Sequence, residues 1–449
     1  SRSRSRRETQ IMDFSVVVDS VCSDLKSPAP ERTGTLVRVV GMTLEARGIL
    51  APVGALCRIE SADHESFDAE VVGFHDEILY LMPFTDPSGA GPGARVRLLS
   101  STARACVGDA QLGRILDGLG RPLDGKPAPI ADKLLGLQGL IINPMERGAI
   151  ETTLDVGVKA INGLLTLGRG QRVGLMAGSG VGKSVLLGMM TKYTNADIVV
   201  IGLIGERGRE VKEFITETLG PDGLAKSIVV ASPANESPVL RLRATLLAHL
   251  MAEYWRDQGK NVLLLVDSIT RVAHAQREIG LAVGEPPTSK GYPPSVFALL
   301  PKLIERSGVG RHGHGSITAI YTVLAEGDDR SDPIIDITRA SLDGQVMLSR
   351  ELADAAFYPA IDLTGSVSRL MNQLMAPDQL EKANYFRRLW ALYQQNKDLI
   401  QVGAYEHGVN PELDEAIKKR PLFEAFMQQD ASERFDFDAT QTALNKVVT

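Results

Sequence analysis

The sequence predicts an α/β protein in three parts: a small antiparallel β-barrel, a core built on a parallel sheet, and a helical region at the end. Short β-branched runs separated by Gly, Pro and Asp turns fill the stretch from about Gly34 to Ser100, which is the pattern of a barrel. Beyond it, continuous apolar strands alternate with helical stretches, as in a parallel sheet covered on both faces. After about Met371 the strand signal disappears and apolar residues recur at helical spacing.

The composition is that of a globular chain of enzyme size. Its 449 residues are too many for one ordinary domain and fit two or three. Hydrophobic residues make up 44% of the chain, and no apolar run reaches the roughly 18 residues that a membrane span needs. The net charge of -6 provides no electrostatic footprint for nucleic acid. The 3 cysteines lack CxxC spacing, which argues against a disulfide framework or a zinc site. We therefore expect a soluble cytoplasmic protein with reduced, buried thiols and no nucleic-acid partner.

The changes of character along the chain predict the domain boundaries. The first ten residues, SRSRSRRETQ, read as an appended remnant or a basic arm, and Met12–Leu25 has the spacing of a short amphipathic helix. The turn cluster Asp117–Gly125 is expected to mark the join between barrel and core. The predicted divisions are a tail with a short helix at 1–28, the barrel domain at 29–100, the core domain at 101–370 and the helical domain at 371–449.

The barrel raises the question of nucleic-acid binding, because small barrels often serve that purpose. The segment Thr35–Ser100 holds nine acidic and only five basic residues, so its negative charge favours a role in packing or subunit contacts. The strands expected in it are Thr35–Val40, Cys57–Ile59, Phe67–Phe74, Ile78–Met82 and Arg95–Leu99.

The core and the C-terminal region are predicted from their apolar patterns. A helix over Pro238–Gln258 has apolar residues at helical spacing between two core strands. Further on, Asn410 and Pro411 are suited to the N-cap and first position of a helix over 412–419. The expected core strands are Arg172–Ala177, Asp197–Gly205, Ser227–Ala231, Asn261–Asp267 and Ser316–Leu324.

A glycine-rich loop, AGSGVGKS over Ala177–Ser184, lies directly between an apolar strand and the apolar helix Val185–Met190. That context is the one a P-loop requires. Its glycines let successive backbone N–H groups face phosphates, and Lys183 is expected to reach the β- and γ-phosphates while the Ser184 hydroxyl binds Mg²⁺. Alanine replaces the usual first glycine at 177, where a strand-end backbone tolerates a side chain. The predicted nucleotide-binding residues of the loop are Ala177, Gly178, Ser179, Gly180, Val181, Gly182, Lys183, Ser184 and Val185.

Two acidic residues follow core strands. Asp267 ends a buried strand and is typical of the second acid at the Mg²⁺ site, where it would act through water. Glu206 lies in GERGRE, after the strand that follows the P-loop helix, and ligands bind at such strand ends. A carboxylate there can orient and deprotonate an attacking water, although a solvated charged loop is the alternative. Together these residues predict hydrolysis of ATP with Mg²⁺.

These motifs resemble the ring ATPases related to rotary ATP synthase catalytic subunits, and most closely the flagellar type III protein-export ATPases, the FliI family. The resemblance spans about Gly34 to Phe437 and is carried by strings such as GRGQRVGLMAGSGVGKSVLLGMM, IGLIGERGREVKEFI, VLLLVDSITRVAHAQREI and YPAIDLTGSVSR. It implies a RecA-like ATPase core and a homohexamer. The segment before Gly34 departs from the family pattern.

The resemblance also implies roles for single residues. Glu206 lies where the family has its catalytic glutamate, and Arg207 where it has an arginine for the γ-phosphate. Tyr358 of YPAID matches the tyrosine that stacks on adenine. Arg369 of SVSR matches the arginine finger that enters the neighbouring subunit's site.

The function implied is ATP hydrolysis at hexamer interfaces that powers or primes the export of flagellar proteins, at the cytoplasmic face of the inner membrane. The implied partners are a stator or regulator protein at the N-terminus, a coiled-coil stalk protein in the ring centre, export-gate membrane proteins and chaperone–substrate complexes. Three alternatives stay open: an injectisome ATPase, disfavoured by GYPPS at Gly291–Ser295; a non-catalytic ring subunit, disfavoured by Glu206; and an RNA-translocating hexamer, disfavoured by the acidic barrel.

Overall fold

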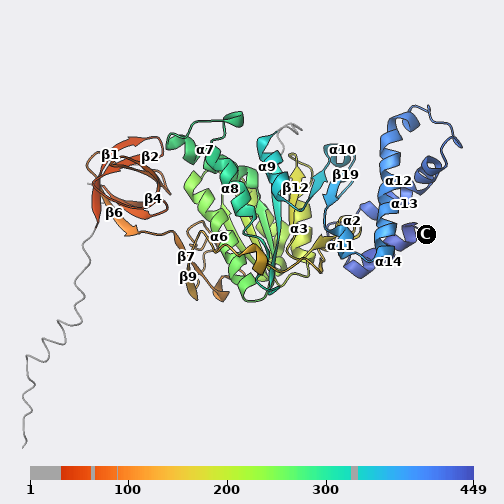
Figure 1. Ribbon diagram of the computed structural model, residues 1–449, viewed down its shortest axis with the longest axis horizontal. Coiled ribbons are helices and arrows are strands. Elements are labelled where there is room, and N and C mark those ends of the chain that lie inside the picture. Colours follow the sequence, from red (N-terminus) through yellow and green to blue (C-terminus); the bar gives the residue numbers. More distant parts are fainter. Residues whose placement is uncertain (1–31, 62–65, 88, 325–331, 449) are drawn as a thin grey trace, which may run out of the picture.

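The computed structural model describes residues 32–61, 66–87, 89–324 and 332–448. The barrel, the α/β core and the helical region follow one another along the longest axis of the molecule (Figure 1). This confirms the predicted fold class. The basic first ten residues and the helix expected over Met12–Leu25 lie outside the described residues. Within the described ranges, no helix combines the length and the apolar character needed to cross a bilayer.

Six described strands close the barrel in the order β1-β2-β5-β4-β3-β6, with antiparallel pairing throughout. Their inward side chains, among them Leu36, Cys57 and Leu81, are fully buried. Burial of Cys57 agrees with the expectation for the thiols, whereas Cys106 is exposed and corrects it, because Cys106 alternates with the inward Ala105 and Val107 on a half-buried strand. The strands are β1 (Thr33–Val40), β2 (Thr43–Arg47), β3 (Leu56–Glu60), β4 (Ser66–His75), β5 (Ile78–Pro83) and β6 (Arg95–Ser100).

The core sheet runs in the order β19-β18-β12-β17-β15-β13-β14-β8, with the short β16 (Gly308–Val309) paired to β17. All its strands along that path are parallel except β19, which pairs antiparallel with β18. Five of the strands were predicted to within one residue at either end, and β8, β18 and β19 were not. The strands are β8 (Ile115–Leu116), β12 (Arg172–Ala177), β13 (Ile198–Ile204), β14 (Ser227–Ser232), β15 (Asn261–Asp267), β17 (Ser316–Leu324), β18 (Gly344–Leu348) and β19 (Ile361–Ser368).

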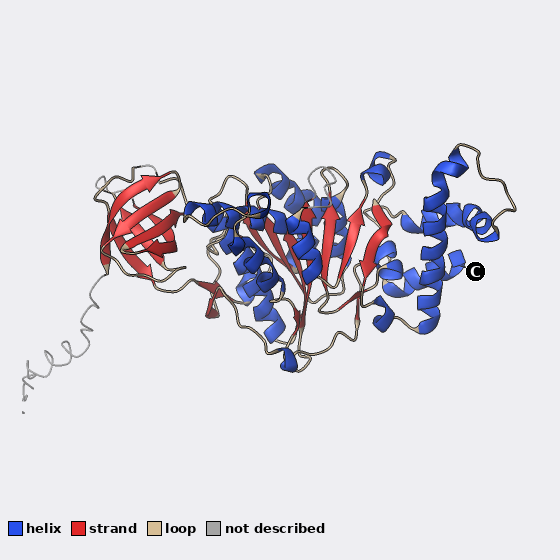
Figure 2. Ribbon diagram, turned by 45° about the horizontal axis from the view of Figure 1, so that its top comes forward, coloured by secondary structure: helices blue, strands red, loops and turns tan. Residues whose placement is uncertain are grey.

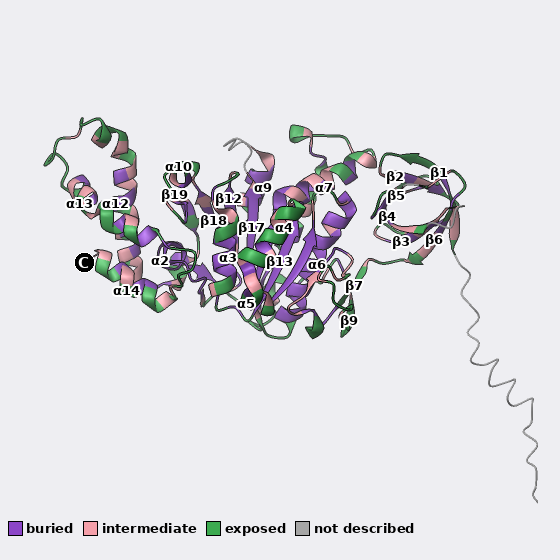
Figure 3. Ribbon diagram, turned by 180° about the vertical axis from the view of Figure 1, so that it is seen from behind, coloured by how far each residue is buried: buried purple, intermediate pink, exposed green. Residues whose placement is uncertain are grey.

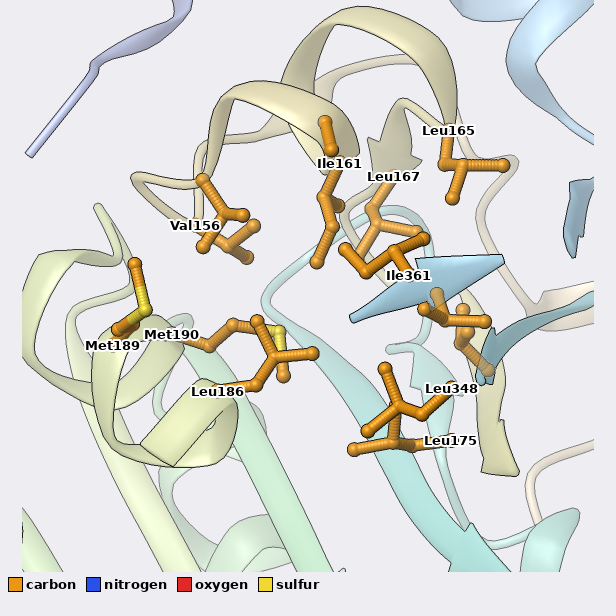
Figure 4. Packing of buried hydrophobic residues seen from close by; sticks show 14 of the residues in the cluster. Val156, Ile161, Leu165, Leu167, Leu175, Leu186, Met189, Met190, Leu348 and Ile361 are labelled. Atoms are coloured by element: carbon orange, nitrogen blue, oxygen red, sulfur yellow. The ribbon is translucent and has the colours of Figure 1, made fainter. Parts of the chain in front are cut away.

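Helices cover both faces of this sheet (Figure 2). Alternate residues of one strand therefore belong to different hydrophobic clusters: Leu263 packs into one cluster and Leu264 into the other. Figure 4 shows part of the first cluster, where Leu186 and Leu175 lie around a common centre with residues of β18 and β19. The central strand β13 is buried along its whole length (Figure 3). The helices are α3 (Lys183–Tyr193), α4 (Gly208–Glu213), α5 (Gly220–Ala225), α6 (Pro238–Asp257), α7 (Ile269–Ala282), α8 (Pro294–Ile304) and α9 (Pro333–Ser341).

The turn cluster Asp117–Gly125 does not mark the join between barrel and core, and this corrects the prediction. The chain already enters the core sheet at β8, which pairs with β14 before the turn. The turn itself is closed locally, since the Arg121 amide donates to Asp117 Oδ1 at 2.8 Å. Between barrel and sheet, β7 (Arg104–Val107) pairs with β9 (Lys133–Gly136).

The chain ends in helices that pack around aromatic residues, with the Phe386 and Phe423 ring centroids 4.3 Å apart. The Asn410 side chain accepts hydrogen bonds from the Glu412 and Leu413 amides, so the predicted cap is present. The helix that follows continues through Pro421 to Met427 instead of ending near 419, because Phe423 and Met427 are buried and their packing offsets the cost of proline. These helices are α11 (Met371–Leu374), α12 (Pro377–Gln401), α13 (Pro411–Met427) and α14 (Phe437–Val448).

Candidate active site

The loop between β12 and α3 has the backbone that a P-loop needs. Gly180 and Gly182 have φ angles of 76° and 83°, a region that residues with a side chain rarely adopt. A Cβ at Gly182 would also lie 3.2 Å from a ring carbon of Tyr358. Ala177 stays in the strand and needs no such freedom. Since α3 begins at Lys183, the loop ends on a helix N-terminus, where an anion is stabilised.

Three predicted site residues meet at the carboxyl ends of β12, β13 and β15. Lys183 Nζ donates to Asp267 Oδ1 at 2.7 Å and lies 3.6 Å from Glu206 Oε1. Asp267 also accepts a hydrogen bond of 2.6 Å from the Thr322 hydroxyl. Each of the three charged side chains is less than a fifth exposed. Lys183 therefore lies between two carboxylates at the end of the loop.

Glu206 has the environment of a base that works near neutral pH. Burial, and after it the nearby Asp267 carboxylate, raises the pKa of Glu206 to about 7, although Lys183 opposes the shift. Its Oε1 is buried and, among the described residues, has no hydrogen-bond partner. A buried carboxylate oxygen without a partner is a place where a water can be held.

The raised pKa predicts how activity depends on pH. Protonated Glu206 cannot accept a proton from water, so kcat/KM should fall as the pH drops through about 7. The fall should approach about tenfold per pH unit, since kcat/KM reports the ionisation of the free enzyme. Initial rates between pH 5 and 9 in buffers of constant ionic strength check this on the wild-type enzyme. A profile that stays flat down to about pH 5 would mean that Glu206 is not the group that titrates.

Two cavities adjoin along the loop. The larger, about 800 Å³, is lined by loop residues, Glu206 and Arg207; the other, about 680 Å³, is lined by Gly182, Tyr358 and residues that follow α13. Both include Gly180, Gly182 and Val185, which makes them one cleft with a polar end and an apolar end. One wall of the apolar cavity was not predicted from the sequence. It consists of Gln428, Gln429, Asp430, Ala431 and Glu433.

The structure separates the predicted arginines. Arg207 lines the polar cavity, where its exposed side chain pairs with Glu210. Arg369 is not among the described residues that line either cavity. Two arginines that the sequence analysis missed, Arg271 and Arg350, also line the polar cavity. The sequence analysis gave neither of them a role, because each follows a different strand and reaches the loop only through the fold.

The residues present fit a Mg²⁺ ion that enters with its nucleotide. Ser184 lines the polar cavity, and Asp267 lies buried beside Lys183; hard oxygen donors of this kind suit Mg²⁺. Among the described residues there is no group of three His, Cys, Asp or Glu side chains that could hold a metal alone.

The parallel sheet, the P-loop after β12 and the acidic residues at the ends of β13 and β15 define a RecA-like P-loop ATPase. Residues 157–368 match the nucleotide-binding domain of the ATP synthase alpha/beta family. Residues 375–446 match the C-terminal domain of the EscN ATPase of type III secretion.

Curated relatives make the assignment more specific. The chain is 56% identical over 407 residues to the flagellum-specific ATP synthase of Pseudomonas aeruginosa, covering 90% of each chain. It is 53% identical over 430 residues to that of Salmonella typhimurium, covering 94% of each. The chain therefore belongs to the flagellum-specific ATP synthase family, and it is an ATPase of the flagellar and type III secretion export class. A type 3 secretion system ATPase of Xanthomonas euvesicatoria is 46% identical, over 93% of this chain and 94% of its own.

Solved structures share the whole architecture. The assembled ATPase EscN of enteropathogenic E. coli is similar with a TM-score of 0.88 at 43% identity, over 93% of this chain and 100% of that one. EscN in complex with its central stalk EscO is similar with a TM-score of 0.85 at 42% identity, with the same coverage. The barrel, core and helical region are thus arranged as in an export ATPase that assembles.

Proposed function

We propose that this chain hydrolyses Mg²⁺–ATP at sites shared by neighbouring copies in a homohexamer, and that this drives flagellar protein export. The observation that carries the shared site is the position of Arg369. Strand β19 runs antiparallel to β18, so Ile361 pairs with Leu348 near the loop and Ser368 pairs with Gly344 at the far edge. Arg369 follows directly after Ser368.

Hydrogen bonds fix this far position. The Arg369 amide donates to the Asp343 carbonyl at 3.0 Å, and Asp343 Oδ2 accepts from the Arg172 amide at 3.0 Å. Arg172 begins β12, whereas the loop follows its last residue, Ala177. Five steps along a strand are roughly 16 Å, which exceeds the reach of an arginine side chain. An exposed Arg369 that serves a phosphate therefore serves the site of another copy.

Within one chain, each of the remaining site residues has its own role in hydrolysis. Lys183 exchanges its carboxylate partners for the β- and γ-phosphates, and Glu206, freed from the lysine, takes the proton of the attacking water. Mg²⁺, when bound, neutralises phosphate charge and would be held by Ser184 and, through water, by Asp267. Tyr358 supports adenine at the apolar end of the cleft. Arg207 lies on the γ-phosphate side.

The family relationship supports our proposal for the partners. EscN was solved with its central stalk, and we propose that a coiled-coil stalk protein occupies the centre of this ring too. A stator or regulator at the N-terminus, export-gate membrane proteins and chaperone–substrate complexes complete the set, at the cytoplasmic face of the inner membrane. The domain division at 29–100, 101–370 and 371–449 is supported by the end of β6 at Ser100 and the start of α11 at Met371.

Lys183→Ala tests the phosphate loop. Without the ammonium group, the loop loses the side-chain charge that would hold the β- and γ-phosphates, so ATP affinity and turnover should both fall, with turnover down at least about a hundredfold. Calorimetric ATP titration and phosphate release measure the two. Lys192→Ala, an exposed lysine on the same helix α3, is the matched control and should behave as wild type. Unchanged turnover in Lys183→Ala would remove the loop from the mechanism.

A further inference from the structure

A short helix, α10 (Arg350–Asp354), lies between the core sheet and α12 of the C-terminal region (Figure 1). It follows β18 and is capped by Ser349, whose side chain accepts from the Leu352 amide at 3.3 Å. Two consecutive residues of this helix reach opposite neighbours. Arg350 Nη2 donates to the Ser179 carbonyl at 3.0 Å, and Glu351 Oε1 accepts from Lys397 Nζ at 2.6 Å.

Arg350 contacts the middle of the phosphate loop, at Ser179. Ser179 lies between Gly178 and Gly180, in the part of the loop where Gly180 has a positive φ. Glycines on both sides leave this backbone without side-chain anchors of its own. A hydrogen bond from a guanidinium is charge-assisted and stronger than one between neutral groups. Arg350 therefore restrains the segment whose amides must face the phosphates.

The other end of α10 reaches the apolar part of the cleft. The Ala353 carbonyl accepts a hydrogen bond of 3.2 Å from the Tyr358 hydroxyl. The Tyr358 ring lies against Gly182. A displacement of α10 would therefore affect both the polar end and the apolar end of the cleft.

The contact of Glu351 leads away from the site. Lys397 belongs to the last two turns of α12, and the pairing with Glu351 raises the pKa of Lys397. The Glu351 side chain is 76% exposed and that of Lys397 31%. An exposed pair of this kind adds little to stability, so it can break and reform without unfolding the protein.

We infer that α10 couples the C-terminal helices to the phosphate loop: the Glu351–Lys397 pair links α10 to α12, and Arg350 transmits a change in the position of α10 to Ser179. Arg350 is in this sense a positioning residue. The inference rests on the proposed phosphate-binding role of the loop. A movement of α12 that breaks the pair would withdraw Arg350 from the loop carbonyl and weaken nucleotide binding, which gives a partner seated on the C-terminal helices a route to the site.

Arg350→Ala should raise KM for ATP and Kd for ADP about tenfold, the usual loss for one charge-assisted hydrogen bond, while kcat stays within about twofold. Arg350→Lys, which retains a charged donor, should recover part of the loss. Steady-state kinetics and ADP calorimetry separate binding from chemistry. A fall in kcat of a hundredfold at unchanged KM would overturn the inference, because Arg350 would then act on the transition state itself.

A mutant cycle tests the coupling. Glu351→Ala and Lys397→Ala should each raise KM about threefold, and neither should add to Arg350→Ala, since both act through it. Exchanging the charges, Glu351→Lys with Lys397→Glu, should restore KM. Lys382→Ala removes a lysine from the same helix α12, where it pairs only with Asp378 among the ion pairs described, and should change nothing.

Additive effects in the cycle, or wild-type KM in both single variants, would overturn the coupling. Neither result would contradict the proposed function, because Lys183→Ala would still abolish turnover. If Lys183→Ala stays active instead, the loop assignment fails first.

Discussion

Arg369→Ala should lower kcat by about 10³–10⁵, the range of arginine fingers, while ATP binding stays intact. During phosphoryl transfer, negative charge spreads over the γ-phosphate oxygens, and a planar guanidinium stabilises it with paired donors. Arg369 is exposed at the sheet edge opposite its own loop, so it can supply this only to a neighbouring copy. Specific activity of the wild type should accordingly rise with protein concentration as rings form.

The measurement is phosphate release under conditions where sedimentation shows full assembly, so that a loss of rings is not mistaken for a loss of chemistry. Arg311→Ala removes an arginine with 57% side-chain exposure and is the control. Arg369→Lys keeps the positive charge but lacks the paired N–H donors of the guanidinium group, so it should restore little of the lost kcat. A near-normal kcat in assembled Arg369→Ala would mean that another residue stabilises the charge on the γ-phosphate.

Glu206→Gln should lower kcat by about 10²–10⁴, the usual contribution of a general base. Glutamine keeps the size of the side chain, so ATP should bind and rings should persist. The fall in kcat/KM below about pH 7 should disappear as well, since the titrating group is gone. Glu213→Gln in α4, where Glu213 pairs with Arg209 at the surface, controls for the loss of a carboxylate nearby. Turnover within a few-fold of wild type would assign the water to a different residue.

Prediction of the fold from sequence succeeded where strands are buried on both faces. Strands such as β15, NVLLLVD, are apolar along their length because helices cover them on both sides. The prediction missed strands toward the edge of the sheet. β18 and β19 alternate buried and partly exposed residues, and their polar residues interrupt the apolar pattern. In the barrel, β2 (TLEAR) was missed for the same reason, since Glu45 and Arg47 interrupt a run of only five residues.

The site divides in a similar way. The phosphate loop, Glu206 and Asp267 could be predicted because a motif and the rule of strand ends place them together. The wall formed after α13 could not, since it reaches the cleft only when the C-terminal helices pack on the core, as the hydrogen bond from the Gln429 amide to the Tyr358 carbonyl shows. Arg350 was missed because nothing in SRELAD distinguishes it from a surface residue.

The central claim is that each site is completed by two chains, and mixing two inactive variants tests it. Lys183→Ala subunits keep Arg369, and Arg369→Ala subunits keep the loop. Mixed rings should regain part of the wild-type turnover, at the interfaces where an intact loop meets an intact Arg369, with a maximum near equal amounts. If mixing restores no activity although differently tagged subunits are shown to occupy the same rings, Arg369 does not act across the interface and the shared site is wrong.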